Sequence, residues 1–183
     1  DVVKKAKVGN PNDPNTQIGP IANKEQYEFI LSKIDDAEKR GLKLLLDGRK
    51  ECKSQGYYIG PTIFDDVPNN DDLAQNEVFG PVVSIHSWEN EKDVIKIAND
   101  TVYGLAAGIW TNDVNKAIRF AEKIEAGTVY INNYFNAAAQ SPVGGFKQSG
   151  YGRENGWEGM QCYMQTKSTW LATEPHQPDP FKS

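Results

Sequence analysis

Residues 105–132 constrain the fold of this chain more than any other stretch. Residues 105–111 form an apolar run without alternation, which predicts a strand covered on both faces. Asn112 is then expected to cap a helix, Gly127 to end it, and residues 128–132 to form a second strand. The helix would place its apolar residues on one face: Val114, Ala117, Ile118, Ala121 and Ile124. Strand, helix, strand is the βαβ crossover, so we expect an α/β fold built on a parallel open sheet with flanking helices.

The chain ahead of this unit predicts further helices and strands. Asn23 is expected to be an N-cap, with Gln26 completing a capping box, for a helix that ends at Gly41. A second helix is expected from Asn90, which caps it with Asp93. Other expected elements are a loop over residues 10–20, strands over 42–47, 57–67 and 81–86, and one helical turn over 71–76.

The last fifty residues predict less regular structure. Residues 133–152 form a long loop rich in Gly, Ala and Ser, and loops of that length within a domain are usually functional. A weak helix is expected over 153–165 and a final strand over 167–172. The proline-containing tail at 173–183 is expected to be flexible.

Composition narrows the class of protein. With 38% hydrophobic and 25% charged residues among 183, the chain is typical of a soluble globular protein. A net charge of −5 argues against nucleic acid as a partner. No apolar run approaches the ~20 residues of a membrane span. Two cysteines are too few for a disulfide framework, which favours a reducing, cytoplasmic location.

A search for catalytic groups finds none with a convincing pattern. Cys52 lies in a polar stretch and Cys162 between two methionines, where packing is the simpler interpretation. His86 and His176 are isolated, so no metal site is predicted. The glycines of residues 144–156 match no phosphate-binding loop and are interpreted as turn residues.

Several motifs, taken in order, resemble the C-terminal part of the NAD(P)-dependent aldehyde dehydrogenases. They are residues 76–82 (NEVFGPV), 99–108 (NDTVYGLAAG), 126–132 (AGTVYIN), 140–150 (QSPVGGFKQSG) and 152–154 (GRE). The resemblance covers about residues 8–172. It implies oxidation of a small-molecule aldehyde to a carboxylic acid with NAD or NADP, through a thiohemiacetal and a thioester on a Cys. It places the catalytic residues upstream of the part matched here, so that this chain contains none and is expected to be inactive alone.

The resemblance also implies cofactor contacts. Glu77 matches the residue that accepts hydrogen bonds from the two hydroxyls of the nicotinamide ribose, a task suited to an ionised, bidentate acceptor. Phe79 matches the aromatic residue beside the nicotinamide ring, and Gln26 aligns less securely with a polar residue near the same part of the cofactor. The simpler alternatives are that Glu77 caps backbone amides, Phe79 belongs to the core and Gln26 only serves the capping box.

Residues 133–150 match the loop that lines the aldehyde tunnel in the family, which assigns Phe135, Asn136, Ala137 and Val143 to the tunnel. Many relatives carry aromatic residues at the positions of Ala137 and Val143. Small residues there would leave a roomier tunnel, suited to bulkier or aromatic aldehydes. Both residues could instead be packing positions.

Assembly and domain boundaries follow from the same resemblance. Residues 1–150 would belong to the catalytic domain, and 151–166 would form a helix returning toward the cofactor domain. Residues 167–172 would be an oligomerisation strand exchanged between subunits of a homodimer or homotetramer, or else an ordinary edge strand. A different class of function also fits, namely a naturally short, non-catalytic assembly partner of a full-length subunit.

Overall fold

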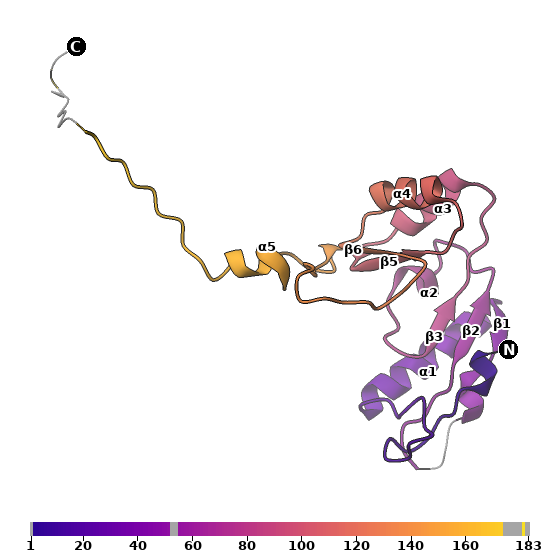
Figure 1. Ribbon diagram of the computed structural model, residues 1–183. Helices are drawn as coiled ribbons and strands as arrows, with labels where there is room; N and C mark the ends of the chain where they lie inside the picture. The colour runs from indigo at the N-terminus through magenta and orange to yellow at the C-terminus, as the bar shows by residue number, and fades with distance from the viewer. Residues whose placement is uncertain (1, 52–54, 174–180, 182–183) are drawn as a thin grey trace. The chain divides into compact units, whose positions relative to one another are not determined.

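The computed structural model describes residues 2–51, 55–173 and 181, and Figure 1 shows their helices and strands. The chain divides into two compact units. The first unit comprises Asp1–Val102 and Glu122–Ile124, and the second comprises Tyr103–Ala121 and Glu125–Ser183. None of the described helices is long and apolar enough to cross a lipid bilayer.

The first unit is built around one three-stranded sheet. Its strands are β1 (Lys43–Leu46), β2 (Thr62–Asp65) and β3 (Val82–Ser84), in the order β1-β2-β3. β2 runs antiparallel to β1, with an irregularity between Leu44 and Leu46, and parallel to β3. The helical segments are η1 (Val3–Lys5), α1 (Lys24–Lys39), η2 (Gly48–Glu51), α2 (Asp72–Gln75) and α3 (Glu91–Asn99).

The caps predicted for this unit are confirmed. The Asn23 side chain accepts the N–H of Gln26 at 2.8 Å and begins α1, which satisfies one of the unpaired amides of its first turn. Asn90 accepts the N–H groups of Lys92 and Asp93 and begins α3 in the same way. Asp71, which was expected only to start a helical turn, is the N-cap of α2.

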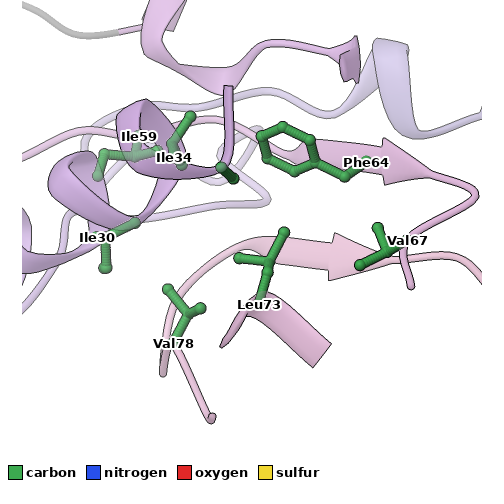
Figure 2. Packing of buried hydrophobic residues seen from close by; sticks show 8 residues of the cluster. Ile30, Ile34, Ile59, Phe64, Val67, Leu73 and Val78 are labelled. Atoms are coloured by element: carbon green, nitrogen blue, oxygen red, sulfur yellow. The ribbon is translucent and has the colours of Figure 1, made fainter. Parts of the chain in front are cut away.

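The core of the first unit lies between α1 and the sheet (Figure 2). α1 buries one face because its apolar residues recur three or four positions apart. Phe64 of β2 is the largest side chain fully removed from solvent. The buried cluster consists of Ile30, Ile34, Ala37, Ile59, Phe64, Val67, Leu73 and Val78.

The second unit contains two pairs of short strands. β5 (Ala106–Ile109) and β6 (Thr128–Ile131) are parallel, and β4 (Tyr103–Gly104) and β7 (Phe146–Lys147) are antiparallel. α4 (Val114–Lys123) connects β5 to β6, which confirms the predicted crossover. α5 (Gly156–Gln161) replaces the longer weak helix expected over 153–165. The expected long loop over 133–152 is interrupted by β7 and by a bridge between Val143 and Glu154.

Two details of the crossover differ from expectation. The cap of α4 is Asp113 rather than Asn112, because the Asp113 carboxylate accepts the N–H of Lys116 at 3.1 Å. β5 is not covered on both faces, since Ala106 is exposed and the other three residues are only half-buried. Trp110, which follows β5, is 65% exposed. The apolar run over residues 105–111, which does not alternate with polar residues, therefore did not indicate a strand buried on both faces.

The described residues have the expected α/β composition of helices and strands, but the expectation of one parallel open sheet is wrong for them. They form three small sheets, two of which contain antiparallel pairs. Parallel pairing requires a crossover of a dozen or more residues, and a helix supplies it between β5 and β6. Between β1 and β2 the described residues form only the short η2, and the pair is antiparallel.

The strand expected over 167–172 is also absent from the described residues. Residues 162–172 carry no regular hydrogen-bonded structure. A strand is defined by backbone pairing, and the residues of this segment alone cannot supply its partner. The side chains of Trp170 and Leu171 are 93% and 89% exposed.

Candidate functional site

The candidate cofactor residues lie on a short irregular segment between α2 and β3. Val78, in the middle of this segment, is buried at 7% exposure and belongs to the core cluster. Glu77 and Phe79 flank it and are both exposed, with the Phe79 ring 76% accessible. The buried middle residue therefore anchors the segment while its two neighbours face outward.

Phe79 has an unusual backbone conformation. Its φ angle is +52°, which lies in the left-handed region that bulky L-residues rarely adopt. Such conformations persist where the surrounding structure holds them, and they cluster at functional positions. The alternative that Phe79 is a core residue is wrong, because its ring is exposed.

Helix α1 packs against this segment at two points. The Nε2 of Gln26 donates to the carbonyl oxygens of Val78 at 2.9 Å and of Phe79 at 3.2 Å. Gly80 approaches Ile30 so closely that a Cβ built on the glycine would lie 2.6 Å from Ile30 Cδ1. The Gln26 amide nitrogen thus serves the segment at 78–79, whereas the backbone N–H of Gln26 serves the helix cap.

Ion pairs hold α2, which leads into the segment. Arg40 donates to both oxygens of Asp71 at 2.8 and 2.9 Å, and Lys33 donates to Asp72 at 2.7 Å. The Arg40 hydrogen bonds lower the pKa of the Asp71 carboxyl below its ordinary value, and the Leu73 N–H adds to this effect. The Lys33 hydrogen bond lowers the pKa of Asp72 in the same way. Both carboxylates are therefore ionised at neutral pH.

A pocket of about 510 Å³ opens beside the segment. It is lined by Leu73, Asn76, Glu77, Val78, Phe79, Gly80, Val82 and Ser84. One carboxylate and one aromatic ring are thus presented at the rim of a concave surface. This arrangement can accept hydrogen bonds from a polyhydroxyl ligand and can pack against a flat ring.

The residues assigned to an aldehyde tunnel lie in the second unit. Phe135, Asn136 and Ala137 are exposed, and Phe135 stacks edge-on against Tyr134 with ring centroids 4.8 Å apart. Val143 is held by paired backbone hydrogen bonds with Glu154, at 2.8 and 2.7 Å, and lines a separate concave surface of about 600 Å³. Phe135, Asn136 and Ala137 are not among the residues that line that surface.

The cysteines and histidines do not form a catalytic group among the described residues. Cys162 is exposed, so the expectation that it packs between two methionines is wrong. The Nε2 of His86 and the Oγ of Ser84 form a hydrogen bond at 3.1 Å. No cluster of metal-ligating side chains occurs in the part of the chain that the structure describes. Cys52 and His176 lie outside the described residues.

Comparison with known proteins identifies the family. The sequence profile of the aldehyde dehydrogenase family matches residues 1–169. Bovine aldehyde dehydrogenase 1A1 is 46% identical over 168 residues, which cover 92% of this chain and 33% of the relative. A putative aldehyde dehydrogenase-like protein of Schizosaccharomyces pombe is 43% identical over 170 residues, covering 93% of this chain and 34% of the relative.

Solved structures agree with this assignment. A betaine aldehyde dehydrogenase from Staphylococcus aureus in complex with NAD⁺ matches all of this chain with a TM-score of 0.91 and 37% identity, over 37% of its own length. A Mycobacterium tuberculosis aldehyde dehydrogenase complexed with NAD⁺ matches 96% of this chain with a TM-score of 0.88 and 42% identity, over 36% of its length. The chain belongs to the aldehyde dehydrogenase family, and it spans about a third of the length of the curated relatives it matches.

The sequence analysis missed the contacts that support the candidate residues. Arg40 and Asp71 are 31 positions apart and Gln26 and Val78 are 52 apart, and no local pattern links either pair. A weak signal in the sequence is the Asp71–Asp72 pair at the start of the helical turn expected over residues 71–76. An acidic pair just ahead of a helical turn is a sign of capping and of cationic partners.

Proposed function

We propose that this chain is part of an enzyme that oxidises an aldehyde to a carboxylic acid with NAD or NADP, and that it forms the C-terminal part of the catalytic domain. Family membership supports the reaction class. The nucleophilic thiol, the general base and the dinucleotide loop belong, in this proposal, to the remaining two-thirds of the enzyme. The observation that carries the role of this chain is the outward display of Glu77 and Phe79 on either side of buried Val78.

The chemistry of these two residues fits a nicotinamide nucleotide. The Glu77 carboxylate is exposed at the pocket, where it can accept hydrogen bonds from the two adjacent hydroxyls of the nicotinamide ribose. The exposed Phe79 ring offers a flat apolar surface to the nicotinamide. The bound cofactor supplies the oxidising power, and Glu77 and Phe79 bind and orient its reactive end.

The substrate tunnel is proposed to include Phe135, Asn136, Ala137 and Val143. Ala137 is small and exposed, and Val143 is 36% exposed on a concave surface. Together with the neighbouring ring of Tyr134, which contacts Phe135, these side chains favour a bulky or aromatic aldehyde over a small one. A higher kcat/KM for acetaldehyde than for benzaldehyde in the complete enzyme would contradict this preference.

Assembly is proposed to use residues 167–172. Trp170 and Leu171 are almost fully exposed in the single chain, and exposed apolar residues on an extended segment are suited to pairing with the edge of a neighbouring sheet. The proposed boundaries are those expected from the sequence: catalytic domain to 150, returning helical segment 151–166, assembly strand 167–172 and tail 173–183. Removal of residues 167–183 should convert a dimer or tetramer to monomers in light scattering.

The test of the proposed activity is NAD(P)⁺-dependent aldehyde oxidation by the complete enzyme that carries this chain. Glu77→Gln keeps the shape of the side chain but removes its charge, so the KM for the cofactor should rise by about tenfold. Glu89→Gln is the matched control, because Glu89 is exposed and is not among the residues that line the pocket. Absence of NAD(P)H formation with aliphatic and aromatic aldehydes alike would overturn the proposal.

A further inference from the structure

The amide of Gln26 contacts two consecutive backbone carbonyls of the segment that presents Glu77 and Phe79. We propose that Gln26 is a positioning residue, which selects the left-handed conformation of Phe79 and so directs the aromatic ring toward the cofactor. This inference rests on the proposed function for the identity of the ligand. The action of Gln26 on Phe79 is inferred from the geometry alone.

The geometry gives the Gln26 amide its selectivity. In an extended strand, consecutive carbonyl groups point to opposite sides, so one donor group cannot reach both. Here the carbonyl oxygens of Val78 and Phe79 both lie within 3.2 Å of a single nitrogen, Gln26 Nε2. That nitrogen carries two hydrogens, one for each acceptor. The pair of hydrogen bonds therefore forms when the backbone turns at Phe79, whose φ angle is +52°.

The turn needs such support because it is intrinsically unfavourable. A bulky L-residue in the left-handed region is disfavoured by about tenfold or more relative to ordinary backbone. Burial of Val78 and the close approach of Gly80 to Ile30 fix the two flanking residues against α1. Gln26 acts between these two anchors, on the peptide groups on each side of Phe79.

The consequence for the site is the direction of the Phe79 ring. Val78 packs inward and Phe79 is 76% exposed, so the turn separates an anchored side chain from a displayed one. Relaxation of Phe79 to an extended conformation would move its ring and change the spacing between the ring and Glu77. Gln26 thus influences cofactor binding through Phe79, without requiring a contact of its own with the ligand.

Three variants of Gln26 distinguish the effect of its hydrogen-bond donor from the effect of its side-chain size. Gln26→Met has a similar length and no donor, Gln26→Glu replaces the donor with a carboxylate that faces two carbonyl oxygens, and Gln26→Lys retains a donor. Glu28→Met is the control for a methionine on an exposed position of α1. All four keep the Asn23 cap, because that bond uses the backbone N–H of Gln26.

The first readout is independent of any ligand. The ¹³Cα and ¹³Cβ chemical shifts of Phe79, measured in the complete enzyme without cofactor, report its backbone conformation. The Phe79 signals are assigned by their loss in the Phe79→Leu variant. We expect left-handed shifts in the wild type, Gln26→Lys and Glu28→Met, and a displacement toward extended values in Gln26→Met and Gln26→Glu. Unchanged shifts in Gln26→Met, or equal displacement in Gln26→Lys and Gln26→Met, would overturn the inference.

The second readout is NAD⁺ binding by the complete enzyme, measured by calorimetry. Gln26→Met should weaken binding by about tenfold, the combined effect of two neutral hydrogen bonds, and Gln26→Lys should restore most of it. Weakened binding with unmoved Phe79 shifts would mean that Gln26 contacts the ligand directly, which overturns a positioning role. A wild type that binds no NAD⁺ would overturn the proposed function, whereas the chemical shifts would still decide the action of Gln26 on Phe79.

Discussion

The Asp71 carboxylate does two things that substitution can separate. Its Oδ1 accepts the N–H of Leu73 at 2.8 Å, which caps α2, and its two oxygens accept from Arg40 at 2.8 and 2.9 Å. An N-cap contributes about 1 kcal/mol. We assign about 1 kcal/mol to the ion pair, since the Arg40 side chain is 36% exposed and water screens its charge. Asp71→Ala should therefore lower the free energy of unfolding by about 2 kcal/mol, and Asp71→Asn, which keeps a capping oxygen, by about 1 kcal/mol.

Urea unfolding followed by circular dichroism measures these differences. The matched control is Asp36→Asn, because Asp36 pairs with Lys39 on the open surface, where the two side chains are 54% and 74% exposed. That control should change the free energy of unfolding by less than about 0.5 kcal/mol. Equal losses in Asp71→Ala and Asp71→Asn would show that the cap contributes nothing. No loss in either variant would refute the assignment of both contributions.

The Asp71 ion pair also predicts a pH dependence. Arg40 lowers the pKa of Asp71 in the folded chain below its ordinary value of 3.8, so the folded chain binds this proton less tightly than the unfolded chain. The stabilisation is therefore present above this unfolded pKa of 3.8 and is lost as the pH falls through the lower folded value. The difference in unfolding free energy between wild type and Asp71→Asn should be constant above about pH 5 and should shrink below about pH 4. A difference that grows toward acid pH would contradict this reasoning.

Two further predictions concern packing. Phe64→Ala empties a fully buried position and should lower the free energy of unfolding by about 3–5 kcal/mol, whereas Phe79→Ala, at a 76% exposed ring, should cost less than about 1 kcal/mol in the same urea titration. A large loss from Phe79→Ala would mean that the ring packs into the structure. Gly127→Ala would place a Cβ 1.6 Å from the carbonyl oxygen of Gly144, a backbone clash that should cost at least about 2 kcal/mol, while Gly19→Ala meets nothing within 4 Å and should be near neutral. Thermal unfolding of both glycine variants checks this, and equal melting temperatures would contradict it.

Local features were predictable from the sequence wherever one or two neighbouring residues determine the backbone. Asn23 and Asn90 were predicted as caps because their short side chains reach amides two or three residues away, and the structure confirms both. The crossover at residues 105–132 was predictable because helical spacing between two apolar runs is a short-range pattern. The family was also recognisable, because several motifs occur in a specific order.

Features that depend on distant partners were not predictable in this way. The antiparallel pairing of β1 with β2 depends on how the intervening chain turns, and the expected strand at 167–172 has the composition of a strand without a partner in the described chain. The cap of α4 is Asp113 and not the predicted Asn112. Both residue types can cap a helix, and only the backbone path decides between them.

The sequence by itself determined the starts of α1 and α3, the crossover, the family and the candidate pair Glu77 and Phe79. Tertiary structure decided how that pair is displayed. Val78 is buried because the core of α1 and β2 receives it, and Phe79 turns outward through a left-handed backbone beside the amide of Gln26. Local sequence determines short-range hydrogen bonding and periodicity, but the conformation of an irregular segment depends on contacts with residues about fifty positions away, and only the folded chain brings these together.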